Sequence, residues 1–279
     1  MMVNQADPGL VEALADATER ALREAETRLP PDVLAALRRA AAAETNGIAR
    51  QELENILENI ALAGERGLPI CQDTGVPVVY LSLPPDVPFS PALFEGVREG
   101  VRRATAAIPL RPNAVDPITR QNTGDNTGAG MPPVHVVPGE RLTVTVLPKG
   151  AGSENVSRIG MLLPSQAAGI PEFVAETMLI AGGRPCPPVI LGVGIGGTFD
   201  AAAALAKEAL LLPADTMDEY EQELCDAVNA LGIGPMGLGG DVTALAVKVK
   251  RAACHTASLP VAVNVQCWAS RRASVEVRL

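Results

Sequence analysis

The stretch PPVILGVGIGGTFDAAAALAKEALLL, residues 187–212, decides the fold class. Its first part, up to Ile195, is an apolar run rich in β-branched residues, which predicts a buried strand. Glycines follow, and residues 200–212 then carry Ala and Leu at the spacing of a helix. A strand that runs through a glycine turn into a helix predicts an α/β protein.

The first third of the chain is predicted to be helical. Apolar residues recur at three-to-four spacing over 8–28, 32–44 and 47–63. Breaks between these segments are marked by Pro30–Pro31 and by Asn46–Gly47. We therefore expect one domain over 1–279, with a helical part over about 1–66 and the remainder over about 67–279.

Strands and helices alternate in the rest of the chain. The predicted strands are 78–83, 187–197, 242–249 and 260–265, and the predicted helices are 90–108, 171–181, 200–212 and 217–232. The segment VHVVPGERLTVTVL (134–147) suggests a hairpin with Pro138–Gly139 in its turn, and Ser90 is the expected N-cap of its helix. The expected fold is α/β, with mixed β-sheets surrounded by helices and a helical N-terminal region.

Composition and charge narrow the classes of function. Apolar residues make up 47% of the 279 residues and aromatic residues only 3%, so the core must consist of Ala, Val, Leu and Ile. The net charge of −9 and the lack of a long basic run disfavour nucleic acid as a partner. No apolar run reaches the length of a membrane span, and the N-terminus lacks the apolar segment of a signal peptide. We therefore expect a cytoplasmic protein.

One glycine motif suggests an alternative function. Gly192, Gly194 and Gly197 match G-x-G-x-x-G between a predicted strand and a helix, as in a dinucleotide-binding fold. The expected acidic residue, Asp215, lies at the right distance, but Pro213 interrupts the helix before it, and the motif is not near the N-terminus. A tight turn is therefore favoured, and an NAD-linked dehydrogenase is kept as an alternative.

The five cysteines carry the main chemical signal. They are Cys71, Cys186, Cys225, Cys254 and Cys267. The first, second and fifth lie in loops or at strand ends, whereas Cys225 lies inside a predicted helix, where packing is the expected role. No C-x-x-C pair is present, which disfavours a zinc ribbon and a bacterial ferredoxin. Three separated thiolates can hold an iron–sulfur cluster with one open iron, a Lewis acid.

The neighbours of these cysteines include candidate catalytic groups. Asp73 could act as a general acid or base, although an Asx turn also explains D-T-G. Arg111 offers a bidentate donor for a carboxylate, or a surface ion pair. The segment KGAGSEN (149–155) could present backbone N–H groups to an anion, or form a plain turn. His255 could be structural, or could join three cysteines around zinc in a binding protein.

Taken together, the motifs resemble one family. They are CQDTG (71–75), RPNAVDP (111–117), QNTGDNTG (121–128), KGAGSEN (149–155), PCPPVILGVGIGG (185–197), IGPMGLGG (233–240) and HTASLPVAVNVQCWASRR (255–272). The set resembles the α-type catalytic half of class I fumarases and tartrate dehydratases, from about residue 10 to the C-terminus. This resemblance lowers the weight of the NAD alternative, because it makes GVGIGG a family glycine turn.

The resemblance implies a cofactor and roles for individual residues. A [4Fe–4S] cluster would be held by Cys71, Cys186 and Cys267, and its fourth iron would bind the substrate. Asp73 matches an acid at the leaving hydroxyl, and His255 matches a histidine beside the cluster. Both are expected to be catalytic, with His255 helping Asp73 to protonate the leaving hydroxyl. The residues that match substrate contacts are Gln72, Asp73, Arg111 and one of Gly150 and Gly152.

The resemblance also implies a partner and a substrate class. Single-chain members continue into a second domain that brings more arginines, a lysine and a threonine proposed as the base, whereas this chain ends at Leu279. A separate β-type subunit in a hetero-oligomer is therefore expected. The expected substrate is a small dicarboxylate. Reversible hydration of fumarate to malate is favoured, and dehydration of L-tartrate is the alternative.

Overall fold

The computed structural model describes residues 7–278, which form two compact units. The first unit consists of residues up to Pro30, Leu62–Lys149 and the chain from Arg271 onward. The second consists of Pro31–Ala61 and Gly150–Ser270. The predicted single domain over 1–279 stays a prediction, and its residues 1–6 and 279 lie outside the described part.

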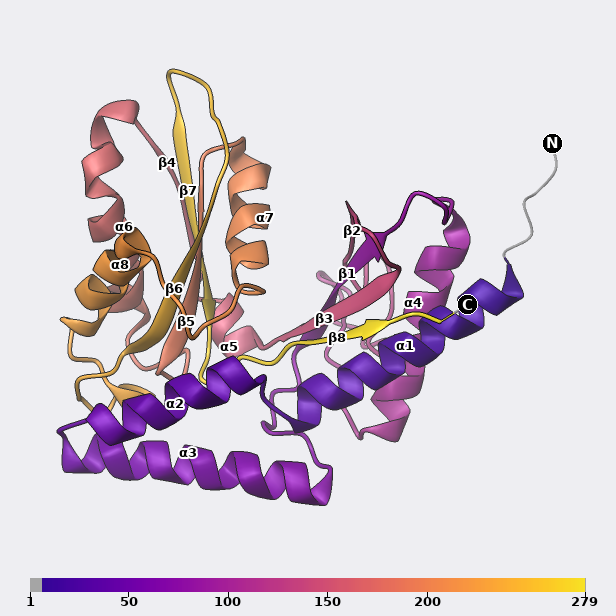
Figure 1. Cartoon of the computed structure of the whole chain (residues 1–279), viewed down its shortest axis with the longest axis horizontal. Coiled ribbons are helices and arrows are strands. Elements are labelled where there is room, and N and C mark those ends of the chain that lie inside the picture. The colour runs from indigo at the N-terminus through magenta and orange to yellow at the C-terminus, as the bar shows by residue number, and fades with distance from the viewer. Residues whose placement is uncertain (1–6, 279) are drawn as a thin grey trace. The chain divides into compact units, whose positions relative to one another are not determined.

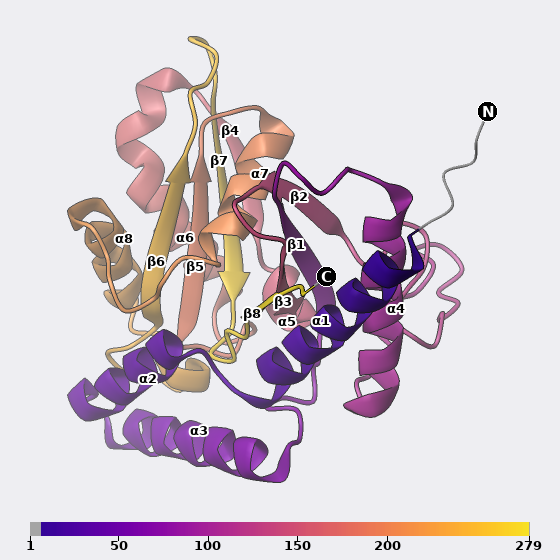
Figure 2. The same ribbon diagram turned by 45° about the vertical axis from the view of Figure 1, so that its right-hand side comes forward.

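The first unit contains a mixed four-stranded sheet and two long helices (Figure 2). The strand order is β2 (Val134–Pro138), β1 (Val76–Leu83), β3 (Thr143–Lys149) and β8 (Ala273–Glu276). Helices α1 (Pro8–Thr27) and α4 (Pro91–Ala107) pack together, and their apolar residues share one core with the strands. As predicted, Ser90 is the N-cap residue of α4, but its side chain makes no capping hydrogen bond.

Glycines allow α1 and α4 to approach closely. A Cβ atom on Gly100 would lie 2.5 Å from the Ala15 carbonyl oxygen, and one on Gly96 would lie 2.8 Å from that of Val11. No side chain longer than hydrogen fits at these points. Helix α1 therefore packs tightly against α4. The C-terminal end of α1 reaches the loop before β1, where Ile70 N–H donates a hydrogen bond to the Glu26 carbonyl.

The predicted hairpin over 134–147 is wrong. Strands β2 and β3 do form there, but they do not pair, because β1 lies between them. Strand β1 runs parallel to β2, with Val79 opposite Val134, and antiparallel to β3, with Val79 opposite Val146. Residues 139–142 therefore connect two strands that flank β1.

The second unit contains another mixed sheet, with helices on both faces (Figure 1). The strand order is β4 (Arg158–Leu162), β7 (Leu259–Gln266), β5 (Val189–Ile195) and β6 (Ala244–Arg251). Helix α7 (Phe199–Ala209) covers one face, and α6 (Ile170–Ala181) and α8 (Glu219–Asn229) cover the other. The short helix α5 (Ala151–Glu154) lies against β7.

The glycines of the dinucleotide-like motif serve packing. A Cβ atom on Gly192 would lie 2.0 Å from the Ala206 carbonyl oxygen, and one on Gly194 would lie 2.1 Å from that of Ala202. Both glycines are inside β5, so they let α7 lie directly on the strand. Because β5 pairs with antiparallel β7 on one side, the sheet also lacks the parallel order of a dinucleotide-binding fold.

The expected fold class is confirmed, because both sheets are mixed and helices pack on them. The helical N-terminal region is present as α1, α2 (Pro31–Ala43) and α3 (Gly47–Arg66). Strands β4 and β8, helix α5 and the 3-10 turns η1 (Pro164–Gly169) and η2 (Pro235–Gly237) had not been predicted. Within residues 7–278, none of the helices combines the length and apolar character that crossing a bilayer requires.

Candidate active site

The loop that carries Cys71 connects α3 to β1 in the first unit. Asp73 forms the expected Asx turn, since its Oδ1 accepts a hydrogen bond of 3.0 Å from Gly75 N–H. Gly75 has φ +71°, and a Cβ there would lie 2.6 Å from the carbonyl carbon of Lys149. The turn therefore needs glycine, and it fixes the Asp73 carboxylate two residues from a half-buried thiol.

Thr74 joins this loop to the polar segment that begins at Arg111. The Arg111 backbone N–H donates to Thr74 Oγ1 over 3.1 Å, and the Asn113 amide donates to the Gly75 carbonyl over 2.8 Å. Asn126 is 1% exposed, and its side chain donates to the Arg111 carbonyl over 2.9 Å and accepts from Asn113 N–H over 2.6 Å. The structure thus brings Arg111 to the loop of Asp73.

The side chain of Arg111 is exposed. In the described part of the chain it forms no ion pair, so the alternative of a surface ion pair has no partner there. Gln72 is also exposed, next to half-buried Cys71 and Asp73. A guanidinium and an amide are therefore exposed on the first unit, next along the chain to, or bonded to the loop of, the half-buried Asp73.

Cys186 and Cys267 lie together in the second unit. Cys186 has φ +54° and closes a turn after α6, in which its N–H donates to the Gly183 carbonyl over 3.1 Å. Its own carbonyl accepts from Trp268 N–H over 3.2 Å, which joins the turn to the residue after Cys267. Both thiols are half-buried.

The glycine-rich loop 233–240 packs against the turn of Cys186. A Cβ on Gly237 would lie 2.7 Å from the Gly183 Cα atom, so the two backbones touch. Met236 N–H donates to the Pro187 carbonyl over 2.8 Å. The IGPMGLGG motif therefore holds the segment on both sides of Cys186.

The KGAG motif also lies beside this turn. Gly150 is buried and is the N-cap residue of α5, and its carbonyl accepts from Ser153 Oγ over 3.2 Å. Gly152 is exposed, and a Cβ there would lie 3.6 Å from the Arg184 carbonyl oxygen. Of the two candidate glycines, Gly152 is thus the one accessible to a ligand near Cys186.

His255 is not brought to these cysteines. It lies in the exposed loop between β6 and β7, where its Nδ1 accepts from Ala257 N–H over 3.0 Å. Cys267 follows the other end of β7, and eight strand residues at about 3.3 Å each separate the two ends by roughly 26 Å. His255 therefore cannot share a proton with a ligand held at Cys267 of the same chain.

The remaining cysteines have other surroundings. Cys225 is buried in α8, and its thiol lies 3.8 Å from the Ala244 carbonyl oxygen. Burial raises the pKa of Cys225 to about 12, so it stays a thiol at neutral pH. Cys254 is exposed beside His255. The predicted packing role of Cys225 agrees with this environment.

The donor set fits an iron–sulfur cluster better than a preformed ion site. Across residues 7–278, no three Cys, His, Asp or Glu side chains form a group that could hold a metal ion. Cys71 belongs to the first unit, and Cys186 and Cys267 belong to the second. Next to Cys267, Gln266 Oε1 and Ser270 Oγ are buried without a hydrogen-bond partner. Of these two atoms, the Ser270 hydroxyl can donate a hydrogen bond, whereas Gln266 Oε1 can only accept one. Thiols with a spare hydroxyl beside them suit a group that both binds sulfur and accepts a hydrogen bond.

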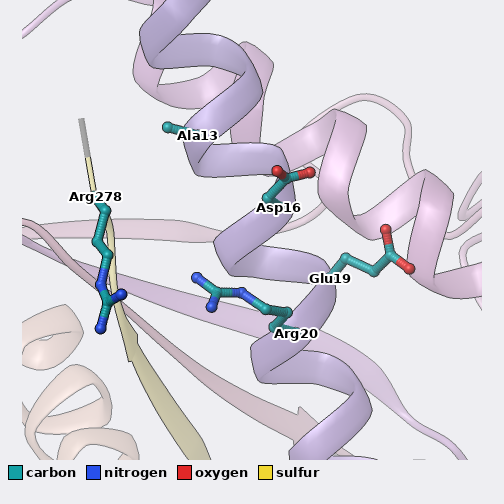
Figure 3. Close-up of a pocket in the computed structure, with 5 residues that line it drawn as sticks. All are labelled: Ala13, Asp16, Glu19, Arg20 and Arg278. Atoms are coloured by element: carbon teal, nitrogen blue, oxygen red, sulfur yellow. The ribbon is translucent and has the colours of Figure 1, made fainter.

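Two surface pockets of about 500 Å³ lie in the first unit. One is lined by residues of the polar segment between Ala114 and Met131. In the other, between α1 and the end of the chain, the guanidinium groups of Arg20 and Arg278 face each other, whereas Asp16 and Glu19 point away (Figure 3). Neither pocket is lined by a cysteine.

Comparison with known proteins places the chain in a family. Residues 15–276 match the family model described as fumarate hydratase (Fumerase). The chain is 45% identical to a putative L(+)-tartrate dehydratase subunit alpha of Methanocaldococcus jannaschii, over 95% of this chain and 98% of that protein. It is 34% identical to the L(+)-tartrate dehydratase subunit alpha of Escherichia coli K12, over 90% of this chain and 86% of that protein.

The chain therefore belongs to the family of class I fumarate hydratases and L-tartrate dehydratases. Within this family it is an α-type hydro-lyase subunit. The family is known to use a [4Fe–4S] cluster, which agrees with the expected cofactor class.

Several residues that build the site were not found from the sequence. Thr74 and Asn126 connect the loop of Asp73 to Arg111, and Arg271 bonds to the same loop. Thr74 and Arg271 both occur inside quoted motifs, CQDTG and QCWASRR. Their closeness in sequence to the candidate ligands Cys71 and Cys267 is the signal that could have identified them. For Asn126, the only signal in the sequence was the unusually high number of Asn and Gly residues around it.

Proposed function

We propose that this chain is the α subunit of an L-tartrate dehydratase, which removes water from tartrate to give oxaloacetate. The observation that carries the proposal is the 45% identity to a putative L(+)-tartrate dehydratase subunit alpha over 98% of that protein. From the sequence, fumarate and malate are favoured, but no residue in it distinguishes these substrates from tartrate. Fumarate hydration is kept as the second candidate, because the matching family model is described as fumarate hydratase.

We propose Cys71, Cys186 and Cys267 as the ligands of a [4Fe–4S] cluster. In support, all three thiols are half-buried, and two of them lie on hydrogen-bonded segments. When bound, the cluster would supply Lewis-acid chemistry at its iron without a protein thiolate. The N–H of Gly152, an exposed residue beside the turn of Cys186, is the proposed backbone contact to the substrate.

The remaining assignments concern side chains of the first unit. Arg111 pairs with a substrate carboxylate, because its guanidinium is exposed and its backbone is fixed on Thr74. Gln72 donates a hydrogen bond to the substrate, and Asp73 gives a proton to the leaving hydroxyl. We assign no step to His255 in this chain, since β7 separates it from Cys267.

A β-type subunit is the proposed partner. The relatives named above are alpha subunits, and an enzyme with an alpha subunit has at least one other kind of chain. The partner would supply the base that removes the proton from the carbon next to the leaving hydroxyl. Without it, the α chain should hold iron but have little dehydratase activity.

The test is anaerobic co-expression with the β-type chain, followed by assays on L-tartrate, malate and fumarate side by side. We expect kcat/KM for L-tartrate to exceed that for malate or fumarate by at least about tenfold. A preference for malate and fumarate would support the second candidate. Activity on none of the three substrates, in protein with a full complement of iron, would overturn both.

A further inference from the structure

A buried ion pair lies behind the loop of Cys71 and Asp73. Arg271 and Glu26 each have a side-chain exposure of 1%, and Arg271 Nη1 donates to Glu26 Oε2 over 2.6 Å. The other terminal nitrogen of Arg271, Nη2, donates to the Asp73 carbonyl over 2.7 Å. One guanidinium therefore bridges the end of α1 and the proposed acid.

The loop is held at more than one point by the same pair of residues. The backbone carbonyl of Glu26 accepts from Ile70 N–H over 2.8 Å, next to Cys71. Its carboxylate holds Arg271, which in turn holds the carbonyl of Asp73. The segment 70–73 is thus attached at both ends to Glu26, once directly and once through Arg271.

Stability alone gives little reason for this arrangement. Taking two charges out of water is costly, and apolar replacements of such pairs are often neutral or stabilising. Burial raises the pKa of Glu26 to about 7 in spite of the adjacent guanidinium, which reflects this cost. In addition, Arg271 Nε is buried without an acceptor. A pair that costs energy and fixes one loop suggests a role in that loop.

We propose that Arg271, held by Glu26, is a positioning residue that fixes the Asp73 peptide and so aims the Asp73 carboxylate at the substrate. The inference rests on the proposed function, in which Asp73 is the acid. The Asp73 peptide is held at its carbonyl by Arg271, and its carboxylate is held by Gly75 N–H, so the side chain can adopt few orientations.

Two substitutions test the contributions of Arg271 and Glu26 separately. Arg271→Lys keeps the charge but offers a point donor, which cannot hold both Glu26 and the Asp73 carbonyl in the planar geometry of arginine. Glu26→Gln keeps an acceptor for Arg271 and removes the buried negative charge. If Arg271→Lys does not fold, Glu26→Gln still tests the proposal, because it loosens the guanidinium without removing it.

A second buried ion pair provides the matched control. Lys248 and Glu221 have side-chain exposures of 7% each and lie on β6 and α8, in the second unit. Lys248→Met removes one partner of a buried ion pair, and Arg271→Lys weakens the other buried ion pair. Unlike Arg271, Lys248 contacts no proposed site residue. Any effect that comes only from loss of stability should appear in both variants.

The first measurement is kinetic, on the reconstituted two-chain enzyme, with kcat expressed per intact cluster. For Arg271→Lys we expect kcat to fall on the order of tenfold to a hundredfold, because misplacement of a reacting group by about 1 Å can cost that much. KM should stay within about threefold, since Arg111 still binds the carboxylate. Lys248→Met should keep kcat per cluster.

The second measurement does not depend on activity. Amide hydrogen exchange of a peptide covering residues 70–76 should accelerate by about tenfold or more in Arg271→Lys and Glu26→Gln, and should not change in Lys248→Met. If kcat per cluster and exchange of this peptide match the Lys248→Met control in both variants, the pair is merely structural. Inactivity of the unmodified two-chain enzyme would instead refute the proposed function, and the exchange data would still decide whether Arg271 fixes the loop.

Discussion

Single residues distinguish the three proposed cluster ligands from the other two cysteines. Cys71, Cys186 and Cys267 are half-buried at loops or strand ends, whereas Cys225 is fully buried and Cys254 is exposed. A ligand needs a thiolate that a metal can reach, and burial raises the pKa of Cys225 far above neutral pH. The difference in environment thus agrees with the assignment made from sequence context.

Serine substitutions test this assignment. We expect Cys71→Ser, Cys186→Ser and Cys267→Ser each to strip iron from the reconstituted protein, because serine is a poor ligand for iron in such clusters. Cys254→Ser is the matched control and should keep iron at the wild-type level. Iron and sulfide content, with circular dichroism to confirm folding, provide the measurement. Loss of the cluster in folded Cys254→Ser or Cys225→Ser would contradict the ligand set.

Arg111 is the proposed contact to a substrate carboxylate. The protein has a net charge of −9 and its proposed substrate is a dianion, so bulk electrostatics oppose binding and local donors must overcome them. Arg111→Ala removes a charge-assisted pair of about 1.5–3 kcal/mol. The expected loss in kcat/KM is roughly tenfold to a few hundredfold. Arg111→Lys should rescue only in part, because lysine cannot bind a carboxylate in a bidentate way.

A neighbouring arginine controls for charge alone. Arg120 lies in the same polar segment and is also exposed. Arg120→Ala lowers the positive charge equally but removes no proposed contact, so kcat/KM should change by less than about twofold. Iron content should be unchanged in all these variants. Equal kcat/KM for Arg111→Ala and wild type would show that Arg111 does not contact the substrate.

At the scale of secondary-structure elements, helix α7 packs so closely on strand β5 that only glycine fits at the contact. A Cβ on Gly194 would lie 2.1 Å from the Ala202 carbonyl oxygen and 2.6 Å from the Ala206 nitrogen. Both atoms belong to the backbone of α7, so the clash with a Cβ atom could be removed only if the whole helix moved. We expect Gly194→Ala to lower the free energy of unfolding by about 1–3 kcal/mol or more, as overpacking does.

Chemical denaturation of the purified chain measures this loss. Gly47→Ala serves as the control, because a Cβ at Gly47, the first residue of α3, meets nothing within 4 Å. That change should be neutral or slightly stabilising. A common unfolding midpoint for the two variants would mean that α7 does not lie so closely on β5.

The elements were predictable from sequence to the extent that their signals are local. Helices such as α4 and α8 follow apolar periodicity and N-capping residues, and the strands around 187–197 and 260–265 are continuous apolar runs. Pairing is not local. Pro138–Gly139 between two strands has the composition of a hairpin turn, yet β1, some fifty residues earlier in the chain, occupies the space between β2 and β3.

The sequence also predicted only part of the candidate site: the residues in its motifs, but not the contacts between them. Motif sequences named Cys186, the KGAG glycines and IGPMGLGG, but nothing in them indicated that Gly237 touches Gly183. Contact between two backbones leaves no trace except glycine itself, and glycine has many other causes. The place of His255 was also hidden, because its twelve-residue separation from Cys267 includes the length of a whole strand.

At the scale of the whole molecule, the proposed cluster has fewer protein ligands than irons. Three thiolates leave one iron without protection by a protein side chain, and each of the three cysteines is half-buried, so solvent can reach them. Such a site should be sensitive to oxygen, since an exposed iron can be oxidised and lost. A β-type partner that completes the active site would also cover part of this surface.

The last prediction compares the α chain alone with the two-chain enzyme in air. We expect iron to be lost from both, and faster from the α chain alone, because its cluster lacks the cover of the partner. Dehydratase activity of the two-chain enzyme should fall in parallel with its iron and return after anaerobic reconstitution with iron and sulfide. Iron content and activity are followed in the same samples, with an anaerobic aliquot as the control. Full activity after prolonged aerobic handling, without reconstitution, would argue against an open iron, and equal rates of iron loss would argue against a partner at this site.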